Sequence, residues 1–423
     1  MKKLLSFLYA LTLLVTAHTT HSMMDNAHFW RATNFYGEPR YEKPWLSSLD
    51  ISIGAGSTGS SRNFDNETAD LLNLYGPHSF QKLGEGVPHK DPNNALDLIL
   101  INLALEPSRG CFGRMIYDGK FKLTEANFMF TQNFTYGFFT QVQFPVRSME
   151  LCDLCRCDLS PKGPACPNQD NIWWQAFLEN FDAILERYCL KVCCFDRSGI
   201  GDTAFLIGWA KNHEETEVLD FIDMTFKTGF LAPTGRERDL SNPFDIANGY
   251  DGHYAIPLVL DTAFGLYEWL NLGFHINALV FFKTTKTTTM QTSLAQNGFI
   301  KLARGRAEID RGTLWNIGSY LKADHVAGGL SVLVAYSFAQ QDQTKISPCD
   351  TNLFDSTIVN NDRTLDGFKM HVINFIAEYD FSREHRRWGP RIGFFYNLQV
   401  GGKRVFKTNM AGALLGLDLS WDI

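Results

Sequence analysis

One pattern constrains the fold of this chain more than any other. Strand-length segments of alternating apolar and polar residues are joined, in turn, by short turns and by long polar connections. From about residue 117 onward this pattern forms five pairs of segments. The short turns within the pairs fall at 135–137, 211–218, 268–271, 324–328 and 382–389. Alternation with a period of two predicts strands that have one apolar face and one polar face.

Two further segments complete the set of strands. Residues 46–56 read "LSSLDISIGAG", and the chain ends on "LLGLDLSWDI" at 414–423. Added to the five pairs, they predict twelve strands. The last segment ends on apolar Ile423, and an apolar strand at an open sheet edge would be an aggregation site. We therefore expect a closed barrel. The segment resembles the final strand of bacterial outer-membrane barrels, which implies contact with the barrel-assembly machinery.

The long connections all fall on one side of the predicted barrel. They lie at about 57–115, 150–199, 233–252, 284–312, 340–366 and 401–409. Both ends of the barrel segment then lie on the side of the short turns, as in outer-membrane barrels, which have short periplasmic turns and long outer loops. The predicted fold is all-β, a closed antiparallel transmembrane barrel of about twelve strands over residues 46–423, with the lipid bilayer of the bacterial outer membrane as its surroundings.

The first residues predict export. Lys2 and Lys3 precede an apolar run from Leu4 to Ala17, and small residues follow. This is the order of a secretory signal peptide, and the run is shorter than the ~20 residues that a membrane-spanning helix needs. We assign residues 1–22 to the signal and residues 23–45 to an N-terminal periplasmic segment.

Composition excludes other classes of protein. Hydrophobic residues make up 45% of the chain, and the mean hydropathy is −0.16. After the signal no apolar run approaches the length of a spanning helix, so a helical membrane bundle is excluded. The net charge of −7 and the lack of a basic stripe argue against nucleic acid as a partner. The 34 Phe residues fit a barrel with aromatic girdles.

Charges inside the strands should point into the lumen. A charge on the lipid face at mid-depth would cost ~2–4 kcal/mol. In the strand around residue 276, for example, Leu272, Phe274 and Ile276 should face lipid, while His275 and Asn277 face inward. The candidate lumen-lining or substrate-binding residues are Asp50, Glu125, Asp223, Lys227, Asp261, His275, Lys322, Asp324, Glu378 and Asp380. They are expected to form ion pairs within the lumen or a selectivity ring.

Two connections are too long to be simple loops. Within 57–115, the segment 64–105 contains "NNALDLILINLAL", which predicts a helix on the rim or a plug inside the lumen. Residues 150–198 contain cysteines and an amphipathic pattern from Trp173 to Tyr188. We expect a partly helical, cysteine-rich outer loop.

Seven of the nine cysteines fall within that second connection. They are Cys152, Cys155, Cys157, Cys166, Cys189, Cys193 and Cys194. In an oxidising compartment they should pair as disulfides. Zinc is the alternative because Cys152 and Cys155 have C-x-x-C spacing, but no second C-x-x-C follows. We expect a stapled loop and assign no metal ligand.

A pair of short motifs precedes and follows the fourth and fifth predicted strands. "GIGDTAFLIGWA" begins at residue 199, and "TFKTGFLAPTGRE" ends at residue 237. We expect Gly199 and Gly201 to permit a sharp turn and Asp202 to accept backbone hydrogen bonds. Further on, Pro233 should end pairing, and Gly235, after Thr234, should adopt a positive φ.

These motifs resemble a pair found in bacterial outer-membrane transporters of the phenol-degradation MetA-pathway family, which is distantly FadL-like. The matching residues are Gly199, Gly201, Asp202, Thr203, Pro233, Thr234 and Gly235. The resemblance covers residues 199–283 well and the other strands loosely. It implies an outer-membrane barrel that passes small or hydrophobic compounds, and it carries no catalytic residue or cofactor.

The sequence contains no constellation that indicates an enzyme. There is no Gly-x-Ser-x-Gly elbow, no His-Glu-x-x-His, and "GAGSTGSSR" at 54–62 lacks the Lys of a phosphate loop. We predict a channel or transporter for small molecules and expect no catalytic residue and no cofactor. The alternatives are a FadL-like transporter of hydrophobic compounds with a luminal plug, and a surface adhesin or structural barrel.

Overall fold

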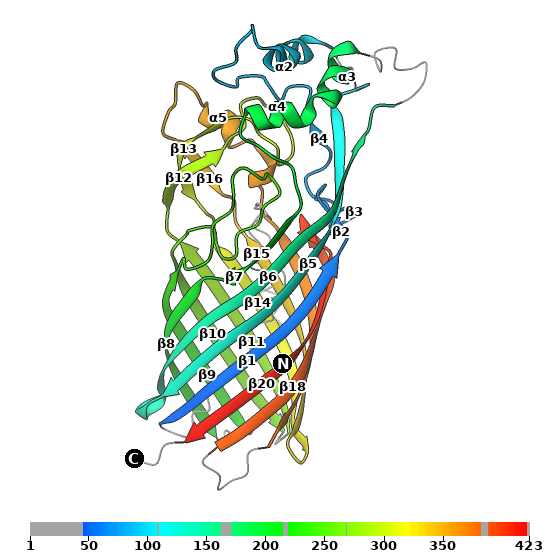
Figure 1. Ribbon diagram of the computed structural model, residues 1–423. Helices are drawn as coiled ribbons and strands as arrows, with labels where there is room; N and C mark the ends of the chain where they lie inside the picture. Colours follow the sequence, from blue (N-terminus) through cyan, green and yellow to red (C-terminus); the bar gives the residue numbers. More distant parts are fainter. Residues whose placement is uncertain are drawn as a thin grey trace, which may run out of the picture.

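The computed structural model describes residues 45–107, 110–161, 171–214, 219–267, 269–381 and 388–420. Twelve strands form a closed antiparallel barrel (Figure 1). In chain order they are β1 (Leu46–Thr58), β5 (Arg114–Asn133), β6 (Phe138–Asp158), β8 (Thr203–Glu214), β9 (Phe221–Ala232), β10 (Ala255–Tyr267), β11 (Leu270–Phe281), β14 (Leu314–Ala327), β15 (Leu330–Gln341), β17 (Lys369–Asp380), β18 (Trp388–Lys403) and β20 (Asn409–Ser420). Each predicted strand falls on one of these twelve.

Barrel closure depends on the first and last strands. β1 pairs with β20, from Leu46 opposite Ser420 to Ser57 opposite Asn409. The other edge of β1 pairs with β5. The register therefore places the beginning of β1 and the end of β20 at the same rim, with the short turns. This rim is called the short-turn end below, and the opposite rim is called the cap end.

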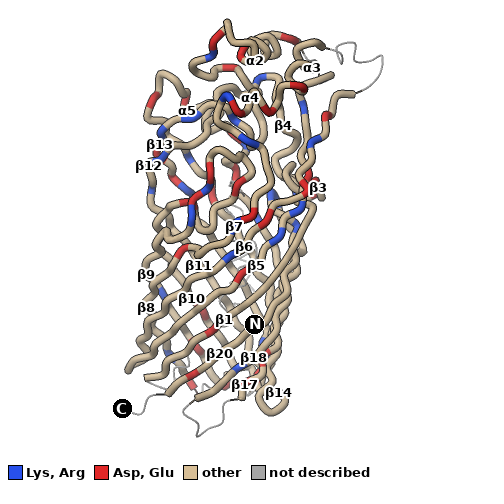
Figure 2. Tube along the Cα trace, in the orientation of Figure 1, with Lys and Arg blue, Asp and Glu red and all other residues tan. Residues whose placement is uncertain are grey.

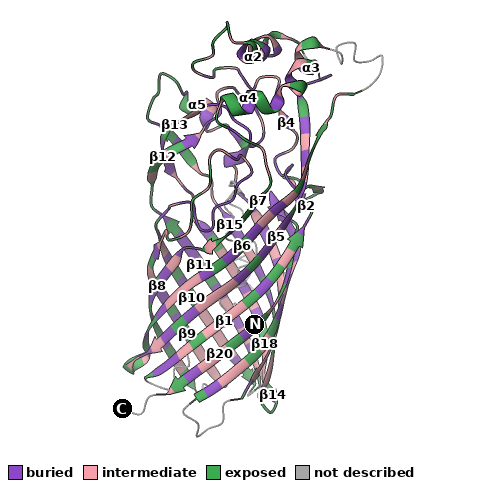
Figure 3. Cartoon of the chain, in the orientation of Figure 1, coloured by how far each residue is buried: buried purple, intermediate pink, exposed green. Residues whose placement is uncertain are grey.

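The alternation of faces is confirmed along the strands, as Figure 3 shows by burial. On β15, Val332, Val334 and Tyr336 are exposed, whereas Leu333 and Ala335 are buried. β18 has the same order, with Ile392 and Phe394 outside and Phe395 inside. The outward residues form an apolar belt around the barrel, and Figure 2 shows that acidic and basic residues gather mainly in the loops at the cap end. This arrangement is stable only where lipid covers the belt.

The hairpin of β5 and β6 is longer than the sequence predicted. Residues 152–158, which were assigned to an outer loop, continue β6 and pair with residues 115–120 of β5. The extension persists because its inner face carries Met115, Tyr117 and Leu151, which are all buried. The hairpin therefore projects past the barrel rim and forms a wall for the loops at the cap end.

The loops at the cap end pack into a body that is called the cap here. It contains α2 (Ala95–Leu105), α3 (Ile172–Glu179), α4 (Phe181–Arg187) and α5 (Ser356–Val359). Its short strands are β2 (Ser60–Arg62), β3 (Thr68–Asp70), β4 (His78–Ser79), β7 (Phe195–Ile200), β12 (Thr284–Thr289), β13 (Arg304–Asp310), β16 (Lys345–Pro348) and β19 (Val405–Phe406). Two 3-10 turns, Thr135–Gly137 and Arg363–Leu365, complete the described elements.

The three larger helices of the cap lie together above the barrel (Figure 1). Asn94 caps the first turn of α2, accepting hydrogen bonds from the backbone N–H groups of Leu96 and Asp97. The Asp97 carboxylate accepts hydrogen bonds from Nε and Nη2 of Arg187 in α4, each at 2.8 Å. It also accepts one from the Tyr188 hydroxyl at 2.9 Å. The helix predicted near residue 95 is therefore present, and it packs with the other cap helices.

The amphipathic pattern near residue 180 forms two helices rather than one. Asn180 interrupts the pattern with φ −102° and ψ 15°, and α4 begins at the next residue. Phe177 and Phe181 still face the same core, where Phe80 contacts both rings with centroids 5.7 and 5.6 Å away. Burial of these rings holds the helices on the cap.

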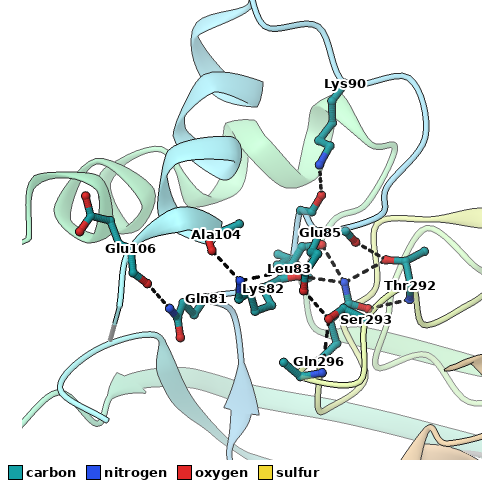
Figure 4. A network of polar contacts seen from close by, with 12 residues as sticks. Gln81, Lys82, Leu83, Glu85, Lys90, Ala104, Glu106, Thr292, Ser293 and Gln296 are labelled. Carbon is teal, nitrogen blue, oxygen red and sulfur yellow. Dashed lines mark hydrogen bonds and ion pairs between the residues drawn. The ribbon is translucent and has the colours of Figure 1, made fainter. Parts of the chain in front are cut away.

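A polar network joins two loops of the cap that are far apart in the sequence (Figure 4). Gln296 donates to the carbonyl oxygens of Lys82 and Leu83, at 3.0 and 3.1 Å. The hydroxyl of Thr292 donates to the Glu85 carbonyl oxygen at 2.6 Å. These bonds satisfy backbone groups that have no strand partner, so the loops form one layer.

Candidate functional site

The barrel encloses a cavity of about 150 Å³ that both apolar and polar side chains line. The apolar part includes Ile51, Phe128, Met129, Phe144, Leu206, Val259, Leu279, Val372, Phe395, Met410 and Leu414. The polar part includes Ser52, Asn127, Gln143, Asn277, Asn316, Ser337 and Asn374. The lumen is therefore amphipathic and less polar than the sequence suggested, because inward positions between the polar residues also carry large apolar side chains.

Four of the ten predicted lumen residues line this cavity. They are Asp50, Glu125, His275 and Glu378. Lys227 and Asp261 lie beside His275. The Asp261 carboxylate contacts Nδ1 of His275, and it lies 3.4 Å from the Nζ of Lys227. β9, β10 and β11 are neighbours in the sheet, which brings these three residues together.

The other four predicted residues lie away from the cavity lining. Lys322 pairs with Asp324 at 3.5 Å beside the turn between β14 and β15. Asp223 is opposite Asn212 where β8 and β9 pair. Asp380 is buried at the end of β17, opposite Arg391 of β18. These three strand ends lie at the short-turn end, below the cavity.

Near the short-turn end, one arginine faces three carboxylates. The Arg391 Nη2 lies 2.6 Å from Asp50 and 3.3 Å from Asp418, and its Nη1 lies 3.6 Å from Glu378. The guanidinium crosses β20 over Gly416, where a Cβ would come within 2.9 Å of Arg391 Cζ. This group of four residues is called the floor cluster. Arg391 is not among the ten residues predicted to line the lumen. It nevertheless lies an even number of residues from Gly393 and Asn397, which face inward, so the alternation places it on the same face.

Nearer the cap end, a buried ion pair joins two neighbouring strands. Arg147 of β6 contacts Glu125 of β5, and their side chains are 2% and 0% exposed. Arg147 also donates to the backbone carbonyl of Asn248 at 2.5 Å. That residue belongs to 233–254, the connection between β9 and β10. Arg147 was likewise missed, although it continues the inward parity of Gln141 and Gln143.

The connection 233–254 folds over the lumen and is called the mouth loop. Arg197 of β7 donates to the Ile246 carbonyl at 2.9 Å and to the Asp245 carboxylate at 2.5 Å. Phe244 and Tyr250 are fully buried, and Tyr250 lines the lumen cavity. The two wall arginines therefore hold this loop at the upper end of the cavity.

The motif around Asp202 fixes both ends of the mouth loop. The Asp202 carboxylate accepts from the backbone N–H of Gly235 at 2.9 Å and of Tyr250 at 2.5 Å. The Thr234 hydroxyl donates to the Gly201 carbonyl oxygen at 2.7 Å. The prediction that Asp202 accepts backbone hydrogen bonds is confirmed.

The glycines of this motif serve close approach rather than unusual dihedral angles. Gly235 does not have the predicted positive φ. A Cβ at Gly235 would lie 2.9 Å from the Asp202 carboxylate, and one at Gly249 would lie 2.1 Å from it. Gly199 continues β7 instead of turning, and its own Cβ would come within 2.7 Å of Asn248. Pro233 directly follows β9, as predicted.

The cysteines are divided between two parts of the cap. Cys152, Cys155 and Cys157 lie on the extension of β6, and Cys189, Cys193 and Cys194 lie between α4 and β7. All six are thiols in this structure. Cys155 and Cys157 are two residues apart on an extended strand, about 6.6 Å between Cα atoms, which is near the upper limit for a disulfide. Cys111 is disulfide-bonded, and Cys166 lies outside the described residues. Pairing among the six thiols stays a prediction.

Within the described ranges, no group of three or more His, Cys, Asp or Glu side chains is placed to hold a metal ion. No helix in those ranges has the length and hydropathy of a membrane span. The closed sheet, its apolar outer belt and its amphipathic lumen define the class of protein. The chain is a transmembrane β-barrel of the outer-membrane type.

Comparison with solved structures finds other outer-membrane barrels. An outer-membrane channel from Pseudomonas putida F1 is 10% identical with a TM-score of 0.47, covering 90% of this chain and 98% of that one. The toluene transporter TodX of Pseudomonas putida is 10% identical with a TM-score of 0.31, covering 89% of each chain. A FadL homologue of Pseudomonas aeruginosa is 8% identical with a TM-score of 0.26, covering 89% and 90%. No family model and no curated protein matches the chain.

Proposed function

We propose that this protein is a channel that lets small amphipathic molecules cross the bacterial outer membrane. The observation that carries the proposal is the lumen cavity, in which Phe128, Leu279 and Phe395 stand beside Asn277 and Asn374. Apolar walls favour an apolar solute, and a few fixed polar groups can orient it. A lumen for hydrophilic ions alone would not need aromatic walls. The motifs around Asp202 and Gly235, which resemble those of the phenol-degradation transporters, support the same class of solute.

The test compares one inward and one outward substitution on the same strand. Leu279 lines the lumen cavity, whereas its neighbour Val280 is exposed on the outer belt. Leu279→Trp should obstruct the lumen and reduce uptake of a small aromatic alcohol into proteoliposomes several-fold. Val280→Trp should leave uptake unchanged because the ring enters lipid. Heat-modified mobility on gels would report that both variants form barrels.

Equal uptake by both variants and the natural protein would contradict the proposal, since the solute would then not pass through this cavity. Absence of any flux or conductance in the natural protein would contradict it as well.

We also propose that β20 mediates recognition by the barrel-assembly machinery. β20 pairs with β1 and closes the barrel, so it must find a partner that lies far away in the sequence. Replacing Leu415 and Leu419, which are exposed on the belt, with Ser should lower the amount of protein in the outer membrane. The same replacement at exposed Val332 and Val334 of β15 is the control.

A further inference from the structure

A second cavity, of about 80 Å³, lies within the cap and is called the cap cavity. Residues of the mouth loop form one wall, and residues of β12, β13, β16 and the 3-10 turn Arg363–Leu365 form the others. Five separate chain segments therefore meet around it.

The charged side chains around the cap cavity are mostly positive. Arg238, Lys301 and Arg311 line it, against the two carboxylates of Asp251 and Asp362. These carboxylates already have partners. Asp362 contacts Lys301 and accepts from the backbone and hydroxyl of Thr364, at 2.9 and 2.8 Å.

Asp251 has a cationic partner that lies outside the cavity lining. It lies 2.5 Å from the Lys286 nitrogen and accepts from the backbone N–H of Arg238 at 3.0 Å. Although burial raises the pKa of Asp251, the charges of Arg238 and Lys286 hold it well below its ordinary value. Asp251 is therefore an anion that two cations face, and its single charge does not offset both.

Arg238 lines the cap cavity and has spare donor capacity. Its Nε is buried and has no hydrogen-bond partner in the described structure. A buried donor without a partner costs about 1–3 kcal/mol, which a bound anion would recover. Guanidinium groups also match carboxylate geometry better than any other side chain.

The remaining walls of the cap cavity are apolar or carry hydroxyl groups. Phe299, Ile309, Ile346 and Leu365 contribute apolar surface, and Thr288 and Thr344 contribute hydroxyls. An inorganic anion would gain nothing from the apolar part. A carboxylate attached to a small apolar body would use both parts.

A contact between Arg311 and Tyr250 links the linings of the cap cavity and the lumen. Arg311 lines the cap cavity, and Tyr250 lines the lumen. The Arg311 guanidinium lies 5.2 Å from the Tyr250 ring centroid and 4.9 Å from that of Phe281. Arg311 also donates to the Tyr250 carbonyl at 3.1 Å. Arg311 and Tyr250 therefore stand between the two cavities.

We propose that the cap cavity is a binding site for a small organic anion, with Arg238 as a principal ligand of its carboxylate. The inference rests on the proposed channel function for its role: the anion would be held above the lumen before it passes Arg311 and Tyr250. The binding step itself needs only the cavity.

Binding of benzoate to the full-length protein in detergent, measured by isothermal titration calorimetry, tests the proposal. Benzamide is the neutral probe of the same shape, and inorganic phosphate is the anion without an apolar body. Benzoate should bind at least about tenfold more tightly than either, since benzamide lacks the charge and phosphate lacks the apolar body, each worth roughly that factor. Equal affinity for benzoate and benzamide, or for benzoate and phosphate, would overturn the proposal.

A matched pair of substitutions locates the site. Arg238→Met should weaken benzoate binding at least about tenfold. Arg236→Met, two residues away on the same loop, is the control because Arg236 is exposed and does not line the cavity. Equal effects of the two substitutions would place benzoate elsewhere and contradict the proposal. If the natural protein conducts solutes but does not bind benzoate, the inference fails and the channel function stands. If it binds benzoate but conducts nothing, the binding site stands and the channel function fails.

Discussion

The two ends of the barrel use buried charges in opposite ways. At the cap end, Arg147 pairs with the Glu125 carboxylate and also binds the mouth loop through the Asn248 carbonyl. At the short-turn end, Arg391 faces Asp50, Asp418 and Glu378. The first arrangement sets one acid against one base and is sealed by a packed loop. Among the described residues, the second sets three carboxylates against one arginine beside the lumen.

The difference indicates what each group of charges can do. A balanced pair that also binds backbone acts as a clamp, because removing one member leaves the other buried and unpaired. Carboxylates beside the lumen act on a solute that passes through it. We therefore expect substitutions at the cap end to change stability and those at the short-turn end to change selectivity.

The largest effect is expected at the clamp. Arg147→Met would remove a counter-charge from the Glu125 carboxylate, which is 0% exposed. Loss of one partner of a buried pair typically costs about 3–5 kcal/mol. Urea unfolding of the barrel in detergent should show a lowered midpoint. The double variant Arg147→Met with Glu125→Gln should recover part of the loss, and no recovery would mean that Arg147 acts mainly through the mouth loop.

Acid should loosen the cap before it affects the barrel. Burial lowers the pKa of His78 to about 4 from its usual 6.5. The folded cap thus disfavours the proton that the unfolded chain accepts. The contribution to stability is complete above pH 6.5 and is lost as pH falls toward 4, roughly 3 kcal/mol in total. Hydrogen exchange of cap amides between pH 7 and 4 should show this loss.

The control for this acid effect replaces the imidazole with a ring that does not titrate. His78 lies among the rings of Phe80, Tyr117, Phe244 and Phe299, so His78→Phe suits the site. The variant should keep its cap closed at pH 4.5. Asp97 titrates in a different pH range, because hydrogen bonds from Arg187 lower its pKa to about 2. Its contribution to the stability of the cap is therefore lost only below about pH 4. Loosening of the variant at pH 4.5 would assign the effect to another group.

A smaller effect is expected for the Asp202 motif. Asp202→Ala removes the acceptor of the Gly235 and Tyr250 N–H groups and should cost about 2 kcal/mol of stability. Since both ends of the mouth loop are then released, solute flux should rise. Asp202→Asn keeps one acceptor oxygen, so its stability and its flux should lie between those of the natural protein and those of Asp202→Ala. A rise in flux without any loss of stability would show that Asp202 holds the loop only weakly.

The smallest energetic effect is expected at the floor cluster, and it should appear in selectivity. A unit charge acting over about 15 Å at an effective dielectric constant of about 20 contributes roughly 1 kcal/mol, or about fivefold in a permeability ratio. Arg391→Gln should raise the preference for cations, and Asp50→Asn should lower it. Reversal potentials in a KCl gradient would measure both. Shifts of the same sign would refute a role for these charges.

The strands of the barrel could be predicted from the sequence because their pattern depends only on neighbouring residues. Each strand alternates residue by residue, so Val332 and Leu333 already indicate lipid and lumen without any knowledge of the neighbouring strands. The twelve strands, their faces and the shared end of the termini follow from this alternation and from the lengths of the connections. The same alternation places Arg147 and Arg391 on inward positions, although neither is among the ten predicted lumen residues.

The site required contacts between residues that are far apart in the sequence. Whether β6 ends at residue 149 or at Asp158 depends on the burial of Met115 and Tyr117 by the cap. The position of the mouth loop depends on Arg147 and Arg197, which come from other strands. No local pattern encodes such pairings.

The sequence by itself thus determined a twelve-stranded barrel with one face toward lipid, because period-two alternation requires only neighbouring residues. The tertiary structure alone decided how the lumen is filled and covered. Which inward charges are paired, where Tyr250 and Arg311 meet, and where a second cavity remains depend on the three-dimensional packing of loops, whose backbone groups take partners wherever the fold supplies them.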